Sequence, residues 1–183
     1  IRPHYSPNEI VVAACTPQDY GAKGDGITDD TAAFQDAANR IAALGGGVIF
    51  VPAGSYAFQG TLSIPDGITL HGDWQDWSTN STGAVGTIFK VYGSRGQSNG
   101  APFIFLTGST ALKGVTIWYP EQNPSNIVPY PFCIGDYGDN VIQNVILVNP
   151  YQGIQVWPPN SGGKHIFSTI IGTPLSKGLD LDM

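Results

Sequence analysis

Apolar residues recur at helical spacing in one segment of the chain and at strand-like spacing after it. The helical segment is predicted over about residues 31–44, because its apolar positions fall three or four residues apart: Phe34, Ala37, Ala38, Ile41 and Leu44. The glycine run 45–47 then ends the helix. From there onward, short apolar runs alternate with Gly- and Pro-rich turns. One helix followed only by strands predicts a lid on a sheet structure.

The loop before this helix and the segment after it carry a resemblance to a known family. The residues concerned are 19–26 (DYGAKGDG), 28–31 (TDDT) and 46–56 (GGVIFVPAGSY). They resemble the opening of the pectate-lyase-like, right-handed parallel β-helix proteins. The most similar patterns are the pectate-lyase-3 type domain and the N-terminal region of β-1,3-glucanase-like glycoside hydrolases. The motifs cover residues 17–73, and beyond them the resemblance depends on strand rhythm alone.

The resemblance implies an all-β fold, a right-handed parallel β-helix with one N-terminal capping α-helix. We therefore expect an N-terminal arm over residues 1–16 and a β-helix domain over 17–183. A strand over 10–14 of the arm is expected to pair along the first coil. The first strands are predicted at 48–51, 55–58, 61–64 and 68–70.

A weak internal repeat supports the stacked coils. Segments that share a β rhythm begin at residues 66, 112, 142 and 165. The first offset, 46 residues, equals two steps of 23, and the last offset is 23. The middle offset is 30 residues and contains the insertion 121–131. A step of 46 residues also relates 132–136 to 178–182, two coils later.

The two ends of such a stack expose sheet edges, which invite aggregation. The helix is suited to cover the first edge. The last segment, 179–183, reads as an unfinished strand with no cap after it. We therefore expect the chain to be the N-terminal part of a longer β-helix, or a partner chain to cover this end.

Composition narrows the possible partners. The 183 residues include only 12% charged side chains, and the formal net charge is −6. This acidic balance argues against nucleic acid as a partner, since phosphates need a basic surface. No apolar run approaches the ~20 residues of a membrane span, so we expect no membrane insertion. The resemblance implies secretion. Cys15 and Cys133 either pair or remain free thiols, and the sequence leaves both possibilities open.

The sequence near the helix start offers one cluster of acidic residues that could be taken for a metal or catalytic site: Asp25, Asp29 and Asp30. We interpret them as turn and helix caps, because Asp side chains accept backbone N–H bonds at such positions. No metal site is predicted from them.

Glycoside hydrolysis requires two carboxyl groups that flank the bond, ~5–9.5 Å apart. Asp180 and Asp182 lie two residues apart on a predicted strand, so both face the same way at roughly 7 Å. By the 46-residue offset, Asp136 is expected on the same face. These three are the candidate catalytic residues, one protonating the leaving oxygen and another activating water. The predicted substrate is a glucan or pectin-type polysaccharide, and hydrolysis needs no cofactor.

Two other readings remain open. A polysaccharide lyase acting on uronate polymers requires a base and commonly Ca²⁺, and Lys164 and His165 lie together on a late coil. A non-catalytic carbohydrate-binding stalk of the tail-spike or adhesin type uses the same solenoid.

Aromatic residues in turns give the predicted substrate-binding surface. Their rings stack on the apolar faces of sugars, and Tyr or Trp adds a polar group. The candidate substrate-binding residues are Trp118, Tyr119, Tyr137, Trp157, Lys164 and His165.

Overall fold

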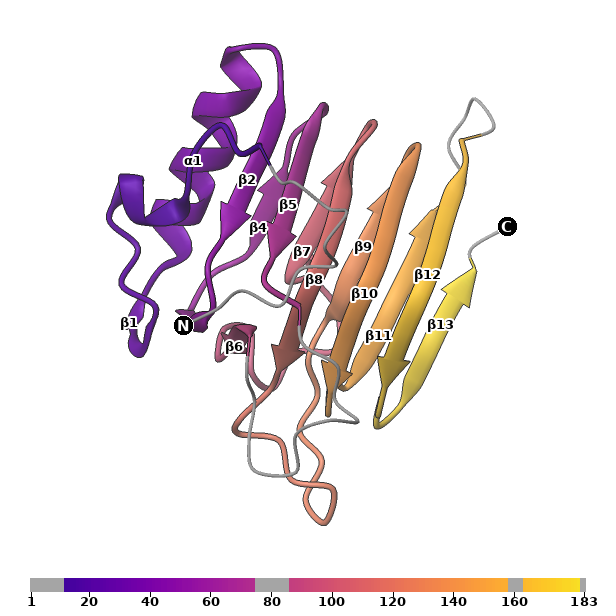
Figure 1. Cartoon of the computed structure of the whole chain (residues 1–183). Coiled ribbons are helices and arrows are strands. Elements are labelled where there is room, and N and C mark those ends of the chain that lie inside the picture. The colour runs from indigo at the N-terminus through magenta and orange to yellow at the C-terminus, as the bar shows by residue number, and fades with distance from the viewer. Residues whose placement is uncertain (1–11, 75–85, 158–162, 182–183) are drawn as a thin grey trace.

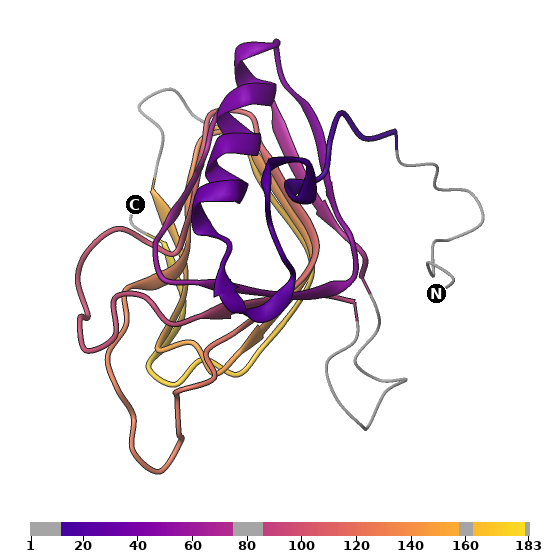
Figure 2. The ribbon, with the colours of Figure 1, turned by 90° about the vertical axis from the view of Figure 1, so that its left-hand side faces the viewer.

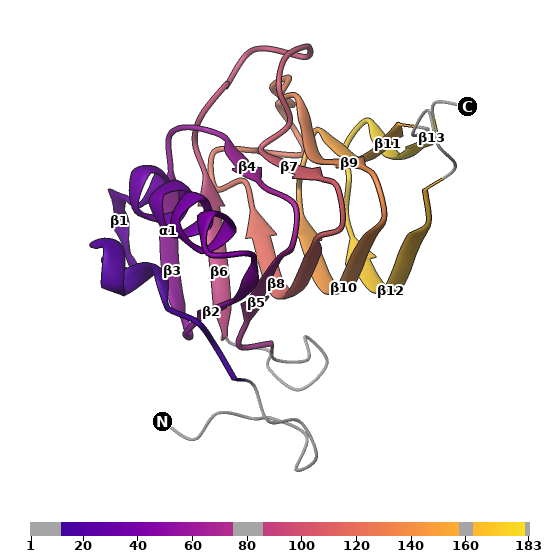
Figure 3. The same cartoon turned by 90° about the horizontal axis from the view of Figure 1, so that it is seen from above.

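The chain winds into a stack of parallel strands. The computed structural model describes residues 12–74, 86–157 and 163–181. Figures 1 and 3 show the coils following one another from the helix-capped end to the C-terminal end. All pairings between the named strands of these residues are parallel. This confirms the parallel β-helix expected from the sequence.

Successive coils contribute strands to the same faces of the solenoid. The chain begins with η1 Pro17–Tyr20, β1 Asp25–Asp29 and α1 Thr31–Ala43, and β1 pairs with β3 at the first edge of the stack. The coils then contain β2 Gly47–Val51, β3 Gly54–Phe58, β4 Leu62–Ile64; β5 Ile68–Gly72, β6 Thr87–Val91, β7 Ile104–Thr107; β8 Ala111–Trp118, β9 Phe132–Tyr137; β10 Asn140–Val148, β11 Gln152–Trp157; β12 His165–Gly172 and β13 Lys177–Leu181.

The cross-section is triangular, as the view along the stack shows (Figure 2). One face is the five-stranded sheet, in the order β13-β11-β9-β7-β4. The other two faces belong to one sheet that bends, because β8, β10 and β12 each turn a corner at a left-handed residue. These residues are Gly114, Asn144 and Thr169, with φ of 67°, 54° and 54°. They occupy matching positions between aligned pairs, so the corner is stacked from coil to coil.

The interior is a column of aligned apolar side chains. On the five-stranded sheet one row consists of Leu62, Ile104, Ile134, Ile154 and Leu179. The three isoleucines are 0–3% exposed, whereas Leu179 in the last described coil is 54% exposed. Each fully buried side chain of this size stabilises the fold by about 1.5–3 kcal/mol. The expectation that another segment or chain covers the last coil stays a prediction.

Helix α1 covers the first coil and confirms the predicted cap. Its buried face includes the predicted Phe34, Ala37, Ala38 and Ile41. The prediction is wrong for Leu44, which follows the helix and is 65% exposed. Phe34 at the centre of the helix meets three aromatic rings edge-on. The ring centroids lie 5.1 Å from Tyr56, 5.0 Å from Phe58 and 5.4 Å from Phe89. The described part of the arm also pairs as expected, since the N–H of Ala14 donates to the carbonyl of Val48 at 2.7 Å.

The acidic residues near the helix start accept backbone N–H groups of turns and loops, as the sequence indicates. The helix-capping part of the prediction is wrong for Asp30, which stands at the N-cap of α1 but makes no side-chain capping bond. Asp25 accepts the backbone N–H groups of Ile27 and Thr28 at 2.9 and 2.8 Å. Asp30, only 1% exposed, accepts those of Lys23 and Gly24 at 2.7 and 3.2 Å. The loop around Asp25 is itself a strand, β1, which the sequence reading missed because its glycines suggested a turn.

The two cysteines do not pair. Cys15 is partly buried at the first coil, and Cys133 is fully buried in β9. Of the two possibilities that the sequence left open, the structure therefore has the free thiols. Burial raises the pKa of the Cys133 thiol to about 12, so this thiol is inert toward ionisation.

The predicted repeat step is wrong in three places. Ile142 pairs with Phe167, so the last step is 25 residues and not 23. Leu70 pairs with Leu112, so segments 66–70 and 112–117 lie on neighbouring coils, not two coils apart. Phe132 pairs with Gln152 and Gln152 with Lys177, which makes the two-coil offset 45 residues instead of 46. Since side chains alternate along a strand, a one-residue error moves a residue to the opposite face.

We predict that Phe34→Ala lowers the free energy of unfolding by about 3–5 kcal/mol, because a buried aromatic side chain is removed without replacement. Urea titration measures the loss. The exposed helix residue Asp36, replaced by Ala, serves as the control and should change stability by less than about 0.5 kcal/mol. Equal effects of the two substitutions would contradict the capping role of the helix.

Candidate functional site

The corrected register places Asp136 inside the solenoid. It lies between Leu106 and Val156 of the neighbouring coils and is 0% exposed. The sequence expected Asp136 on the same face as Asp180 and Asp182, which is wrong for Asp180. Asp180 pairs with Gln155, one position away from the inward row, and therefore faces outward. Asp182 lies outside the described residues.

Asp136 is held by a buried polar network at one corner of the solenoid. Asn140 Nδ2 donates to Asp136 Oδ1 at 2.5 Å, and His165 Nδ1 lies 2.8 Å from Asp136 Oδ2. Asn140 Oδ1 in turn accepts the N–H and hydroxyl of Thr110 at 2.9 and 2.6 Å. The network thus links the starts of β10 and β12 to the end of β9.

Burial dominates the electrostatics of this corner. It raises the pKa of the Asp136 carboxyl, while the hydrogen bonds from Asn140 and His165 and the charge of His165 oppose that rise. His165 Nε2 is buried and has no hydrogen-bond partner within the described part of the chain. Asp136 therefore cannot touch a polymer on the outside of the solenoid in this conformation, whereas the His165 side chain is 15% exposed.

The outer face of the five-stranded sheet carries an aromatic cluster. Phe105, Tyr137 and Trp157 come from three successive coils and surround Gly135. The Phe105 centroid lies 5.6 Å from that of Trp157 and 6.4 Å from that of Tyr137. Tyr137 is 41% exposed, and the other two rings are partly exposed. The cluster therefore offers ring surface to solvent.

Glycine is required at the centre of the cluster. A Cβ on Gly135 would lie 2.7 Å from the Trp157 ring, 3.1 Å from the Phe105 ring and 2.6 Å from Pro102. These approaches are closer than normal van der Waals contact, so any side chain at position 135 would displace the rings. The bare backbone is what lets them close over the strand.

Charged groups lie beside the cluster on the same sheet. Lys177 Nζ lies 3.2 Å from Asp180 Oδ2 and 5.9 Å from the centroid of the Phe132 ring. Lys177 is 56% exposed and Asp180 35%. Such a solvent-exposed ion pair adds little stability, so both charges are available to a ligand.

The remaining predicted substrate-binding residues do not join this surface as a group. Trp118 lies on the bent sheet, where Lys90 Nζ is 5.7 Å from its ring centroid. Tyr119 is 1% exposed, so its expected position on the surface is wrong. Lys164 is exposed and its backbone N–H donates to Asp139 Oδ1 at 2.5 Å, whereas His165 belongs to the buried network.

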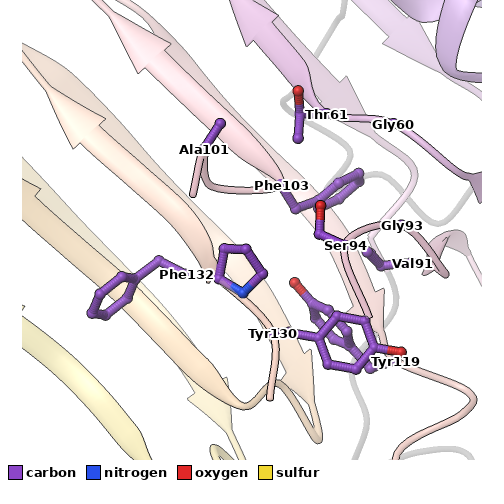
Figure 4. Close-up of a pocket in the computed structure, with 11 residues that line it drawn as sticks. Gly60, Thr61, Val91, Gly93, Ser94, Ala101, Phe103, Tyr119, Tyr130 and Phe132 are labelled. Carbon is purple, nitrogen blue, oxygen red and sulfur yellow. The ribbon is translucent and has the colours of Figure 1, made fainter. Parts of the chain in front are cut away.

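Two long loops border the start of the five-stranded sheet. They span residues 92–103 and 119–131 and project together from one corner of the solenoid (Figures 2 and 3). At their base is a shallow depression, partly open to solvent (Figure 4). Its walls include Phe103, Tyr130 and Phe132. Ser94 beside them has a left-handed backbone, with φ of 59°.

The sequence reading missed Phe105, Phe132, Gly135 and the loop-binding Gln152. Phe105 lies within an apolar run, where the correct register alone reveals that it faces outward. Phe132 has the same strand parity as the inward Ile134, but it lies at the start of β9 and is only partly buried. Gly135 resembles an ordinary turn glycine in the sequence. Among the described residues, no three side chains of metal-ligating types lie together, and no helix is long and apolar enough to cross a membrane.

We predict that Asp136→Asn changes how stability depends on pH. A carboxyl whose pKa in the folded state lies above its ordinary value of 3.8 stabilises the fold fully below that value and loses this contribution as the pH rises through the folded-state pKa. As the pH rises, the free energy of unfolding of the variant should therefore increase relative to that of the native chain, by about 1.4 kcal/mol per unit of pKa shift. Urea unfolding between pH 3.5 and 7 measures this, with Asp36→Asn as the control. A difference independent of pH would contradict it.

Comparison with known proteins relates this solenoid to polysaccharide-modifying enzymes. The chain is 48% identical over 50 residues to mannuronan C5-epimerase AlgE5 of Azotobacter vinelandii, covering 27% of this chain and 5% of that protein. It is 46% identical over 53 residues to alginate lyase 7 of the same organism, covering 29% and 6%. The chain thus spans a small part of the length of these curated relatives.

A solved structure extends the similarity over the whole solenoid. The A-module of mannuronan C5-epimerase AlgE4 from Azotobacter vinelandii matches with a TM-score of 0.63 and 21% identity, over 91% of this chain and 48% of that one. At this identity the match shows the fold. Residues 17–123 match the family model for rhamnogalacturonase A/epimerase, pectate lyase-like proteins. Because this match covers more than half of the chain, the protein belongs to the rhamnogalacturonase A/epimerase, pectate lyase-like family.

Proposed function

We propose that the protein binds a polysaccharide along the outer face of its five-stranded sheet and takes part in modifying that polymer outside the cell. The observation that carries this proposal is the exposed cluster of Phe105, Tyr137 and Trp157. Rings that meet around a bare backbone, on a regular sheet, form a rigid apolar platform. Sugars present apolar C–H faces to such platforms and hydroxyl groups to the polar residues around them.

The substrate that we propose is a polymer of uronic acids. Lys177 lies on the same sheet as the platform and its ammonium group is more than half exposed. A uronate carboxylate can replace Asp180 as the partner of this ammonium group. The names of two relatives, mannuronan C5-epimerase and alginate lyase, point to the same class of substrate. This supports proton abstraction from a uronate, which leads to epimerisation or elimination, as the reaction.

Hydrolysis is the second candidate, since the family also includes rhamnogalacturonase-type members. It requires two carboxyl groups on one face. Asp180 supplies one carboxyl group on the outer face, and Asp182 remains the proposed second one. Asp136 does not, because it is buried inside the solenoid. A requirement for Ca²⁺ stays a proposal that belongs to the lyase chemistry, and a purely binding stalk is the outcome if no product forms.

The reaction type is tested by assaying the purified protein with polymannuronate, polygalacturonate and β-1,3-glucan, with and without added Ca²⁺. Elimination gives an unsaturated product that absorbs ultraviolet light, epimerisation changes the proton NMR spectrum without chain cleavage, and hydrolysis gives reducing ends alone. We expect change in a uronate polymer and none in the glucan. Activity on the glucan alone would contradict the proposal that the substrate is a uronate polymer.

We predict that Trp157→Ala weakens binding of the polymer about five- to tenfold, which corresponds to about 1–1.4 kcal/mol of lost ring stacking. Affinity electrophoresis or calorimetry with the polysaccharide measures the change. Trp118→Ala is the matched control, because Trp118 is partly buried on the bent sheet, away from the cluster. The reverse order of effects would move the binding surface to the bent sheet.

A further inference from the structure

The two long loops beside the five-stranded sheet are joined by one buried side chain. Gln152 of β11 is 7% exposed, and its Nε2 donates to the carbonyl of Ser98 at 2.8 Å and to that of Tyr130 at 3.0 Å. Ser98 belongs to loop 92–103 and Tyr130 to loop 119–131. One amide group therefore binds a backbone carbonyl from each loop at once.

Two other contacts join the loops directly. The N–H of Gly96 donates to the carbonyl of Pro129 at 2.8 Å. Arg95 and Glu121 form an ion pair at 3.2 Å, but their side chains are 50% and 46% exposed. Exposed ion pairs of this kind contribute little stability. Neither contact involves the sheet, whereas the buried side chain of Gln152 binds both loops to strand β11.

A second glutamine, Gln122, differs from Gln152 because its side-chain bonds stay within a single loop. Gln122 Nε2 donates to the carbonyl of Val128 at 2.6 Å, and its Oε1 accepts the N–H of the same residue at 3.0 Å. Both bonds lie inside loop 119–131. Gln122 shapes one loop, whereas Gln152 couples two loops to the sheet.

Gln152 also lies where the loops meet the proposed binding face. It pairs with Phe132 on one neighbouring coil and with Lys177 on the other. Phe132 and Tyr130 line the depression at the base of the loops (Figure 4). The coupled loops therefore rise directly beside the Lys177–Phe132 end of the sheet.

We propose that Gln152 is a positioning residue that makes loops 92–103 and 119–131 into a single rigid wall beside the proposed polysaccharide-binding face. This inference rests on the proposed function, since it assigns the wall to that face. The wall limits the side from which a polymer reaches Lys177.

The test replaces Gln152 by Ala and by Glu, and Gln143 of β10 by Ala as the control on the other sheet. Removing the donor takes the side-chain partner from the buried carbonyl of Tyr130 and from the part-buried carbonyl of Ser98, and a carboxylate cannot donate to them. We expect both position-152 variants to speed hydrogen exchange in peptides from both loops. We also expect KM or the polymer Kd to rise about five- to tenfold with kcat changed less than twofold. Gln122→Ala should speed exchange in loop 119–131 alone.

The outcomes separate this inference from the proposed function. If the native protein binds no polysaccharide, the proposed function fails, while the exchange data still decide whether Gln152 couples the loops. Unchanged exchange, or faster exchange in one loop only, overturns the coupling. Faster exchange in both loops without any change in KM or Kd overturns the assignment of the wall to the binding face.

Discussion

Each coil of this protein must place its inward side chains directly over those of the coil before it. Parallel strands stack about 4.8 Å apart, and alternate side chains point to opposite faces. The row from Leu62 through Ile134 to Leu179 obeys this constraint over the described coils. The same constraint determines which residues face outward, because the residues that alternate with the inward row must point to the opposite face of the sheet. Phe105 and Trp157 become neighbours for this reason, although they lie far apart in the sequence.

Variation in this solenoid is confined to the corners between strands. Loop 92–103 lengthens one coil and loop 119–131 lengthens the next, yet the strands on both sides keep a continuous register. Backbone bonds across the loops and the buried amide of Gln152 compensate for the added chain. A rigid sheet with adjustable corners separates the requirements of stability from those of recognition. The exposed aromatic platform can thus stay fixed while the neighbouring loops determine what reaches it.

The sequence predicts the first part of this fold well and the later coils poorly, for physical reasons. Helix α1 has strong local signals, namely a 3.6-residue period, acidic caps and a glycine run. The later register has none, because neighbouring coils differ in length: Leu70 pairs with Leu112, but Asn140 pairs with His165. An apparent repeat of 23 residues fits such data by chance. The aromatic cluster depends on this register, so Tyr137 and Trp157 were recognised as sugar-stacking types while their partner Phe105 was not.

Asp136 fixes the register of neighbouring coils in a way that an apolar side chain at the same position could not. Its row neighbours Leu106 and Val156 fill the same space by packing alone, and they accept many alternatives of similar volume. A buried carboxyl is costly unless its oxygens are bonded, and here the partners must come from Asn140 and His165, at the starts of the next two coils. Sliding either coil by one residue would remove one partner and leave one oxygen of the Asp136 carboxyl without its bond. The polar corner therefore selects one register among many that apolar packing tolerates, and it does so next to Tyr137, where the outer face must be in the correct position.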